Sequence, residues 1–221
     1  MNKENLTYLL SLAKKGNPFG EEIILVGATK TISADVINQA VDLGLNVVAE
    51  NKVQEFREKT DLIDKRASQH FIGHLQTNKV KYLIGKVDLI HSVDSMHLAD
   101  AISKESVKKG VTTNVLIEIN VGGELSKSGF DFENVFDAVR NVSALPNVRV
   151  KGLMAMLPKS DNKDLLKSLC TKMRKAFDML KENDPFITHL SMGMSADYDI
   201  AIECGSNMIR LGSRIFGERI Y

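Results

Sequence analysis

Lys30 directly follows a short, mostly apolar run, residues 23–29, that is rich in β-branched side chains. Such runs are typical of strands buried on both faces, so this one would bring the lysine amine to one end of a sheet or barrel. Partial burial disfavours the charged form of an amine, lowers its pKa and makes it a nucleophile for an aldehyde. The alternative is a purely structural lysine whose long side chain reaches water.

Two later stretches carry residue types that bind phosphate. Residues 193–197 (GMSAD) and 211–213 (LGS) each place a small-residue turn and a serine after an expected strand. We expect Ser195 and Ser213 to begin helices, because serine is a favoured N-cap residue. Backbone N–H groups at helix N-termini bind anions, which makes these two turns, with Gly212, a candidate phosphate site. The alternative is two ordinary helix caps.

Arg210 lies in an apolar run, residues 208–211, and its guanidinium needs an acceptor because it stays charged. Glu50 or Glu203 could form a structural ion pair with it, or a ligand's ring nitrogen could accept from it. An amine, a phosphate loop and an arginine together suggest pyridoxal 5′-phosphate as the cofactor. Its aldehyde would react with Lys30, its phosphate would bind at the two serine turns, and its pyridine nitrogen would face Arg210.

The elements that must position these residues alternate between strand and helix. After a first helix over 5–15, apolar runs predict eight strands, at 23–29, 46–50, 70–73, 89–93, 114–121, 148–156, 187–192 and 207–211. Helical spacing predicts helices at 33–43, 52–64, 77–84, 95–108, 131–143, 163–181 and 195–203. This alternation predicts the α/β class, as a single (β/α)₈ TIM barrel with an extra N-terminal helix. The C-terminal ends of barrel strands form the site, which would bring the candidate residues together.

An open doubly wound sheet is the alternative fold. It would normally carry a glycine-rich turn after its first strand, and residues 28–31 read ATKT there instead. The strand ends offer no carboxylate cluster and no Cys/His metal set, so we expect no metal site.

Composition narrows the classes of protein. The 221 residues are 43% hydrophobic and carry a net charge of +1, which favours one domain over 1–221 and no nucleic-acid partner. No apolar run reaches the ~18 residues of a membrane span, and the N-terminus does not resemble a signal peptide. Cys170 and Cys204 lack metal-ligand spacing and are interpreted as reduced thiols, so we expect a cytoplasmic location.

Eight stretches repeat the motifs of one known family in the same order. They are TKT (29–31), ENKVQE (50–55), FIGHLQTNK (71–79), HSVDS (91–95), ELSKSG (124–129), GLMAM (152–156), LSMGMSAD (190–197) and IRLGSRIFG (209–217). The chain resembles, from about Ile23 to Tyr221, the YggS/PROSC family of pyridoxal phosphate homeostasis proteins, whose fold is similar to the barrel domain of alanine racemase. Ala49 and Lys52 depart from the family, which more often has Gly and Arg there.

The resemblance implies a set of cofactor-binding residues. Lys30 would form the Schiff base, Arg210 would face the pyridine nitrogen, and Asn51 would lie near the ring. The resemblance places Ser195, Gly212 and Ser213 around the phosphate, with Met192 and Met194 as packing. His74, Asn78 and Lys79 on the third loop, and Glu124, Ser126 and Lys127 on the fifth, could serve the ligand or only make ordinary loop contacts.

Two classes of function remain open. The resemblance implies a carrier that binds pyridoxal phosphate and delivers it in the cell, in transient contact with apo-enzymes, as a monomer or weak homodimer. The alternative is an amino-acid racemase-like enzyme, which needs a second acid/base group. Only His74 and Tyr198 are candidates, without motif support, and only four residues follow Gly217. We therefore expect no added domain, no catalytic residues and no efficient turnover.

Overall fold

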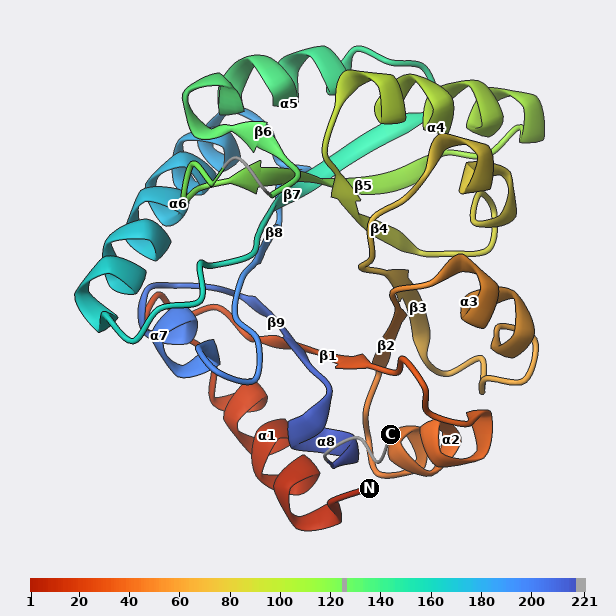
Figure 1. Cartoon of the computed structure of the whole chain (residues 1–221), viewed down its shortest axis with the longest axis vertical. Helices are drawn as coiled ribbons and strands as arrows, with labels where there is room; N and C mark the ends of the chain where they lie inside the picture. The colour runs from red at the N-terminus through yellow and green to blue at the C-terminus, as the bar shows by residue number, and fades with distance from the viewer. Residues whose placement is uncertain (125–126, 218–221) are drawn as a thin grey trace.

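The computed structural model describes residues 1–124 and 127–217, and parallel strands at its centre form a closed barrel (Figure 1). The barrel strands are β1 (Ile24–Ala28), β2 (Val47–Glu50), β3 (Ser68–Phe71), β4 (Leu89–Val93), β5 (Thr113–Asn120), β7 (Val148–Ala155), β8 (His189–Ser191) and β9 (Met208–Leu211). Each pairs in parallel with its neighbours, and the β1–β9 and β4–β5 pairs close the ring. The expected (β/α)₈ TIM barrel is confirmed.

Helices surround the barrel on its outside (Figure 1). They are α1 (Lys3–Lys15), α2 (Ala34–Asp42), α3 (Val53–Lys59), α4 (Met96–Lys109), α5 (Val135–Ser143), α6 (Lys163–Asn183), α7 (Tyr198–Glu203) and α8 (Ser213–Phe216), with 3₁₀ helices η1 (Thr77–Tyr82) and η2 (Phe132–Asn134). Among the described residues, no helix is both long enough and apolar enough to span a bilayer.

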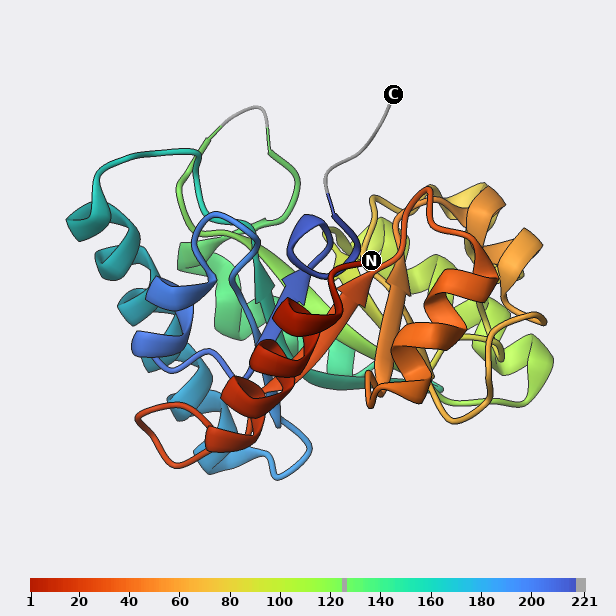
Figure 2. The same cartoon turned by 90° about the horizontal axis from the view of Figure 1, so that it is seen from below.

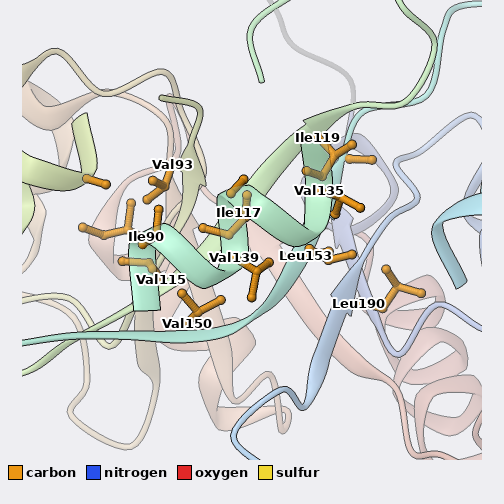
Figure 3. Packing of buried hydrophobic residues seen from close by; sticks show 14 of the residues in the cluster. Ile90, Val93, Val115, Ile117, Ile119, Val135, Val139, Val150, Leu153 and Leu190 are labelled. Atoms are coloured by element: carbon orange, nitrogen blue, oxygen red, sulfur yellow. The ribbon is translucent and has the colours of Figure 1, made fainter. Parts of the chain in front are cut away.

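The main hydrophobic core lies between the strands and the helices. Figure 3 shows Val115, Ile117 and Ile119 of β5 against Val135 and Val139 of α5. These side chains alternate along β5, so every second residue faces the helices. Full burial of each such side chain contributes about 1.5–3 kcal/mol, and this layer fixes the strands on which the site is built.

The N-terminal helix α1 covers the part of the barrel that the last helix leaves open. Helix α8 has only four residues, and α1 packs Leu6 and Leu9 against a cluster that includes Leu25 of β1 and Ile209 of β9. The backbone N–H of Asn2 donates to the Ile215 carbonyl at 2.9 Å. Figure 2 shows α1 and α8 side by side. The extra N-terminal helix predicted from the sequence therefore completes the outer wall.

Inside the barrel, an apolar layer lies below a polar one. The apolar layer includes Val26, Ala49, Leu89, Leu116, Met154 and Met208. Two positions farther along three of these strands come His91, Glu118 and Arg210, whose side chains point to the same interior by alternation. This polar layer is the floor on which a ligand at the C-terminal mouth would rest.

Several expected element boundaries were wrong. The expected helix 195–203 begins only at Tyr198, because residues 195–197 form a turn in which Asp197 Oδ1 accepts from the Met194 N–H at 2.6 Å. The expected helix 52–64 ends at Lys59, and the expected helix at 77–84 is the 3₁₀ helix η1. The sequence did not predict the two-residue strand β6 (Phe130–Asp131), which pairs with the end of β5.

Candidate functional site

A cavity of about 480 Å³ opens at the C-terminal ends of the barrel strands, within the size range of cofactor pockets. Six of the seven predicted site residues line it, namely Lys30, Asn51, Ser195, Arg210, Gly212 and Ser213. The other lining residues are Ala28, Ile72, Gly73, His74, Met156, Met194 and Ala196. Strands β1, β2, β3, β7, β8 and β9, with the loops that follow them, thus supply the residues that line this cavity.

Lys30 sits in a tight turn rather than at the end of its strand. Strand β1 ends at Ala28, and the Ile32 N–H donates to the Thr29 carbonyl at 3.0 Å across the turn. Thr31 has a φ of 65°, in the left-handed region that β-branched residues avoid. Such a conformation costs about 1–3 kcal/mol, so surrounding contacts must hold this turn in place.

The serine turns meet at one end of the cavity. Ser213 Oγ lies 3.1 Å from Ser195 Oγ, and Arg214 Nε donates to the Ser195 carbonyl at 3.3 Å. Ser213 is the first residue of α8, with Gly212 as its N-cap, so the first N–H groups of α8 lack partners within the helix. The prediction that Ser195 is a helix N-cap was wrong, because α7 begins only at Tyr198. Ser195 nevertheless lies beside Ser213.

Arg210 forms the floor of the cavity and is bound to the barrel backbone. Its Nη1 donates to the Ser191 carbonyl at 3.0 Å and to Ser191 Oγ at 2.5 Å, and its Nη2 donates to the Ala155 carbonyl at 3.1 Å. Burial lowers the pKa of Arg210 to about 10, against the opposing effect of Glu118 and Asp197, so it remains charged at neutral pH. The guanidinium has five N–H groups, of which Nε–H and one Nη2–H have no partner within residues 1–124 and 127–217.

Neither ion pair considered for Arg210 from the sequence exists. Glu50 pairs with Lys59 at 2.9 Å, and Glu203 pairs with Lys167 at 2.7 Å. Glu50 faces outward because its neighbour Ala49 faces the barrel interior, and Glu203 lies at the exposed end of α7. The acceptors of Arg210 are instead backbone carbonyls and a hydroxyl.

Two buried histidines continue the polar contacts below Arg210. His91 Nδ1 lies 3.2 Å from Ser191 Oγ, and His91 Nε2 lies 3.0 Å from His70 Nδ1. Burial lowers the pKa of His70 to about 4 and holds the pKa of His91 well below its usual range. Both rings are therefore neutral at physiological pH. His91, the first residue of the motif at 91–95, thus lies within β4 and below the cavity.

Glu118 is a buried carboxyl that the sequence analysis missed. It faces the barrel interior from β5, and burial, with a further contribution from Asp94, raises its pKa to about 7 despite Arg210 and His74. The available signal was a single glutamate within the apolar run of residues 115–119, at the same alternation as Leu116. Glu118 is therefore a titratable acid near Arg210.

Met192 does not line the cavity, contrary to its expected role as packing for the cofactor. Ser191 points inward to Arg210, so the next side chain on the chain points outward, and Met192 is fully buried in the main core. Met194, two residues later, does line the cavity. The expectation failed because it treated neighbouring residues at a strand end as equivalent.

The two candidates for a second acid/base group are placed differently. His74 lines the cavity, its side chain is 64% exposed, and its Nδ1 lies 3.1 Å from Asp94 Oδ2. Tyr198 lies instead in the outer cluster that α1 joins. Beside His74, a Cβ on Gly73 would lie 1.9 Å from the Asn51 carbonyl oxygen, so glycine allows these two loops to meet at the cavity.

The remaining loop residues make contacts of their own. Asn78 and Lys79 belong to η1, outside the cavity lining. Lys127 pairs with Glu124 and donates to the Leu157 carbonyl at 3.2 Å. Ser126, the third candidate on that loop, lies outside the described residues.

Residues 27–220 match the family model described as alanine racemase, N-terminal domain. A pyridoxal phosphate homeostasis protein of Aquifex aeolicus is 46% identical over 199 residues, which cover 89% of this chain and 87% of that protein. The chain belongs to the family of pyridoxal phosphate homeostasis proteins. This confirms the resemblance inferred from the eight sequence motifs.

Solved structures place this family member among barrels of the same shape. PipY of Synechococcus elongatus, with pyridoxal phosphate bound, has a TM-score of 0.80 at 29% identity, over 96% of this chain and 100% of that one. An alanine racemase of Clostridium difficile has a TM-score of 0.78 at 18% identity, over 99% of this chain and 57% of the racemase. The second likeness concerns the fold alone.

Proposed function

We propose that this protein binds pyridoxal 5′-phosphate as a Schiff base on Lys30 and serves in cytoplasmic homeostasis and delivery of that cofactor, without efficient catalysis. One observation carries the proposal. Lys30, Arg210 and the adjacent Ser195 and Ser213 line one cavity. An amine, a cation and a pair of hydroxyls at a helix start match the aldehyde, ring nitrogen and phosphate of one molecule.

The residues present fit the cofactor. The Asn51 side-chain oxygen is buried and has no hydrogen-bond partner among the described residues, so a polar group of a ligand would satisfy it. Arg210 is only a donor, which requires an acceptor such as an unprotonated ring nitrogen above it. A Cβ at position 212 would lie 3.3 Å from the Ala28 carbonyl oxygen. Glycine therefore lets the chain after β9 lie close to the end of β1 at this wall of the cavity.

The covalent step is reversible and needs no external reagent. The unprotonated Lys30 amine adds to the aldehyde carbon, a C=N bond replaces the C=O bond, and the oxygen leaves as water. No electrons are exchanged, and addition of water returns the aldehyde and the amine. Reversibility suits a protein that releases its ligand to apo-enzymes, which we propose as transient partners of a monomer or weak homodimer.

The relatives support this function. The Aquifex aeolicus protein is named for pyridoxal phosphate homeostasis, and the PipY structure contains pyridoxal phosphate. The second candidate function is an amino-acid racemase-like activity, which the position of His74 at the cavity favours. Against it, the His74 side chain is mostly exposed and pairs with Asp94 at the mouth, and Tyr198 lies elsewhere.

Exchange of the Cα hydrogen of free amino acids decides between the two functions. Racemization removes a proton from one face of Cα and returns one to the other, so it needs two positioned acid/base groups. A missing group reduces the rate by about 10²–10⁴-fold, far below an ordinary kcat of ~10 s⁻¹. We expect only slow deuterium exchange with L-alanine and L-serine, and no racemic product by chiral analysis.

Racemization at several turnovers per second would reverse this conclusion if it is lost in both Lys30→Ala and His74→Ala. Loss in Lys30→Ala alone would point to a different second acid. The exposed Lys65→Ala variant is the matched control, because it removes a lysine that does not line the cavity.

A further inference from the structure

We propose that Lys59 is a positioning residue for Lys30: its ammonium group, shared by two carboxylates, holds the turn from which the Lys30 side chain enters the cavity. The inference rests on the proposed function, because its consequence is the ease with which Lys30 forms a Schiff base. None of the motifs behind the predicted site includes Lys59, and its side chain does not line the cavity.

The Lys59 amine has three acceptors and therefore uses all three of its N–H groups. It donates to the Thr29 carbonyl at 3.1 Å, to Glu50 Oε1 at 2.9 Å and to Glu55 Oε2 at 2.9 Å. Burial alone would lower the pKa of Lys59, but the hydrogen bonds to both glutamates outweigh it and raise the pKa. Lys59 is thus a permanent cation, only 14% exposed, beside the barrel wall.

The two carboxylates hold the residues on both sides of Lys30. Thr29 Oγ1 donates to Glu50 Oε1 at 2.7 Å, and the Thr31 N–H donates to Glu55 Oε2 at 2.7 Å. With the bond from Lys59 to the Thr29 carbonyl, three contacts fix the backbone that flanks Lys30. This cluster of Thr29, Glu50, Glu55 and Lys59 lies on the outer side of the strands, away from the cavity.

The contact with Thr31 has a specific reason. Thr31 adopts the left-handed φ of 65°, which a threonine leaves unless its surroundings hold it. In a turn of this kind the third position is usually glycine or asparagine. The hydrogen bond from the Thr31 N–H to Glu55, whose carboxylate Lys59 orients, opposes relaxation of Thr31 and so keeps the direction of the preceding side chain.

Removing the cation would release the turn. Glu50 is almost fully buried, and its Oε2 has no partner among the described residues. Without Lys59, Glu55 would lose the cation that orients its carboxylate, and this side chain, more exposed than Glu50, would turn to water. Thr31 would then lose its hydrogen bond and relax, and Lys30 would no longer point steadily at the aldehyde.

The experiment compares two ligands that differ only at the reacting carbon. Pyridoxal phosphate can form the Schiff base, followed by its absorbance near ~420 nm, whereas pyridoxine 5′-phosphate has an alcohol there and cannot. For Lys59→Met we expect Schiff-base formation to weaken by about 10–100-fold, the scale of a misplaced reacting group. We expect the affinity for pyridoxine phosphate to stay within about twofold of the wild type, because the cavity itself is intact.

Glycine at position 31 supplies a rescue that a general folding defect would not show. Gly takes a positive φ without strain, so Lys59→Met/Thr31→Gly should recover about half of the lost affinity on a logarithmic scale. Glu55→Ala removes the acceptor of the Thr31 N–H together with one of the two carboxylates that Lys59 binds; it should weaken Schiff-base formation in the same direction, and Thr31→Gly should rescue it as well. Lys65→Met is the surface control.

The outcomes separate this inference from the proposed function. A wild-type protein that forms no Schiff base would refute the proposed function itself. A wild type that forms one, with Lys59→Met and Glu55→Ala equal to it, would refute the positioning role alone. If Lys59→Met weakened the binding of both ligands equally, or if glycine at position 31 gave no rescue, Lys59 would support the barrel in general. Either result would also overturn the inference.

Discussion

Arg210 can only donate, and this sets the direction that we expect for the hydrogen bonds below the cavity. Arg210 donates to Ser191 Oγ, and we expect the Ser191 hydroxyl to donate in turn to His91 Nδ1, the other polar side-chain atom within hydrogen-bond distance of it in the part of the chain that the structure describes. His91 would then carry its hydrogen on Nε2 and donate it to His70 Nδ1, and both rings would be Nε2–H tautomers. Ser191 and the Ala155 carbonyl hold the Arg210 guanidinium at the cavity floor.

We predict the Nε2–H tautomer for both His70 and His91. Because their pKa values are lowered by burial, to about 4 for His70, neither should titrate between about pH 8 and pH 5.5. Nitrogen-15 NMR of the imidazoles measures both points. The exposed His97 provides the reference for an accessible ring. An Nδ1–H signal from His91, or its protonation near pH 6.5, would contradict the assigned direction.

At the residue scale, residue type predicted more than orientation did. The apolar run with a following lysine, the arginine within a strand and the two serine turns identified five residues that line one cavity, and the family resemblance added Asn51. Met192 was misplaced because alternation turns it outward, and Glu118 was missed because the apolar run concealed an inward carboxyl. The Lys59 contacts join residues 30 positions apart, and no local pattern encodes them.

At the scale of elements, the phosphate end of the cavity is built from the ends of β8 and β9. These strands pair in parallel, and the loops that follow them bring Ser195 and Ser213 within 3.1 Å. Gly193, with a φ of 97°, lets the first loop pass close to α7, where a Cβ would lie 2.8 Å from the Ala201 Cβ. Adjacent strand ends therefore place two hydroxyls and the start of α8 together.

Replacing both Ser195 and Ser213 with alanine should weaken the affinity for pyridoxal phosphate by about 1–3 kcal/mol, the scale of hydrogen bonds to a charged group. Titration by absorbance or calorimetry gives this value. Pyridoxal without phosphate should bind the wild type poorly and should bind the double variant about as poorly. The exposed pair Ser11→Ala/Ser168→Ala controls for loss of hydroxyls. Equal binding of pyridoxal and its phosphate to the wild type would contradict a phosphate site here.

The strand pattern predicted the elements better than it predicted their ends. Strand 89–93 was predicted with its observed bounds, and the others within about two residues. The start of α7 was misjudged because Ser195 is a favoured cap, whereas Asp197 is the residue that forms the local hydrogen bond. The pairing of β6 with β5 is a tertiary contact that a local pattern does not contain, and helical spacing alone did not distinguish the 3₁₀ helix η1 from an α-helix.

At the scale of the whole molecule, regular alternation of strands and helices was enough to predict the barrel. Eight parallel strands must close or leave two edges exposed, and the β1–β9 and β4–β5 pairs close them. The short α8 would leave β1 and β9 uncovered, and α1 covers them from the other end of the sequence (Figure 1). Closure brings the first and last strands together, which puts Lys30 and Arg210 in one cavity.

The most direct test of the central claim is the site of covalent attachment. The purified protein, loaded with pyridoxal 5′-phosphate, is reduced with borohydride, digested and mapped by mass spectrometry, because reduction converts a Schiff base into a stable secondary amine. We predict one adduct, on Lys30, absent from the Lys30→Ala variant and retained in Lys65→Ala. An adduct on another lysine, or none after loading, would contradict the assignment of Lys30 as the residue that holds the cofactor.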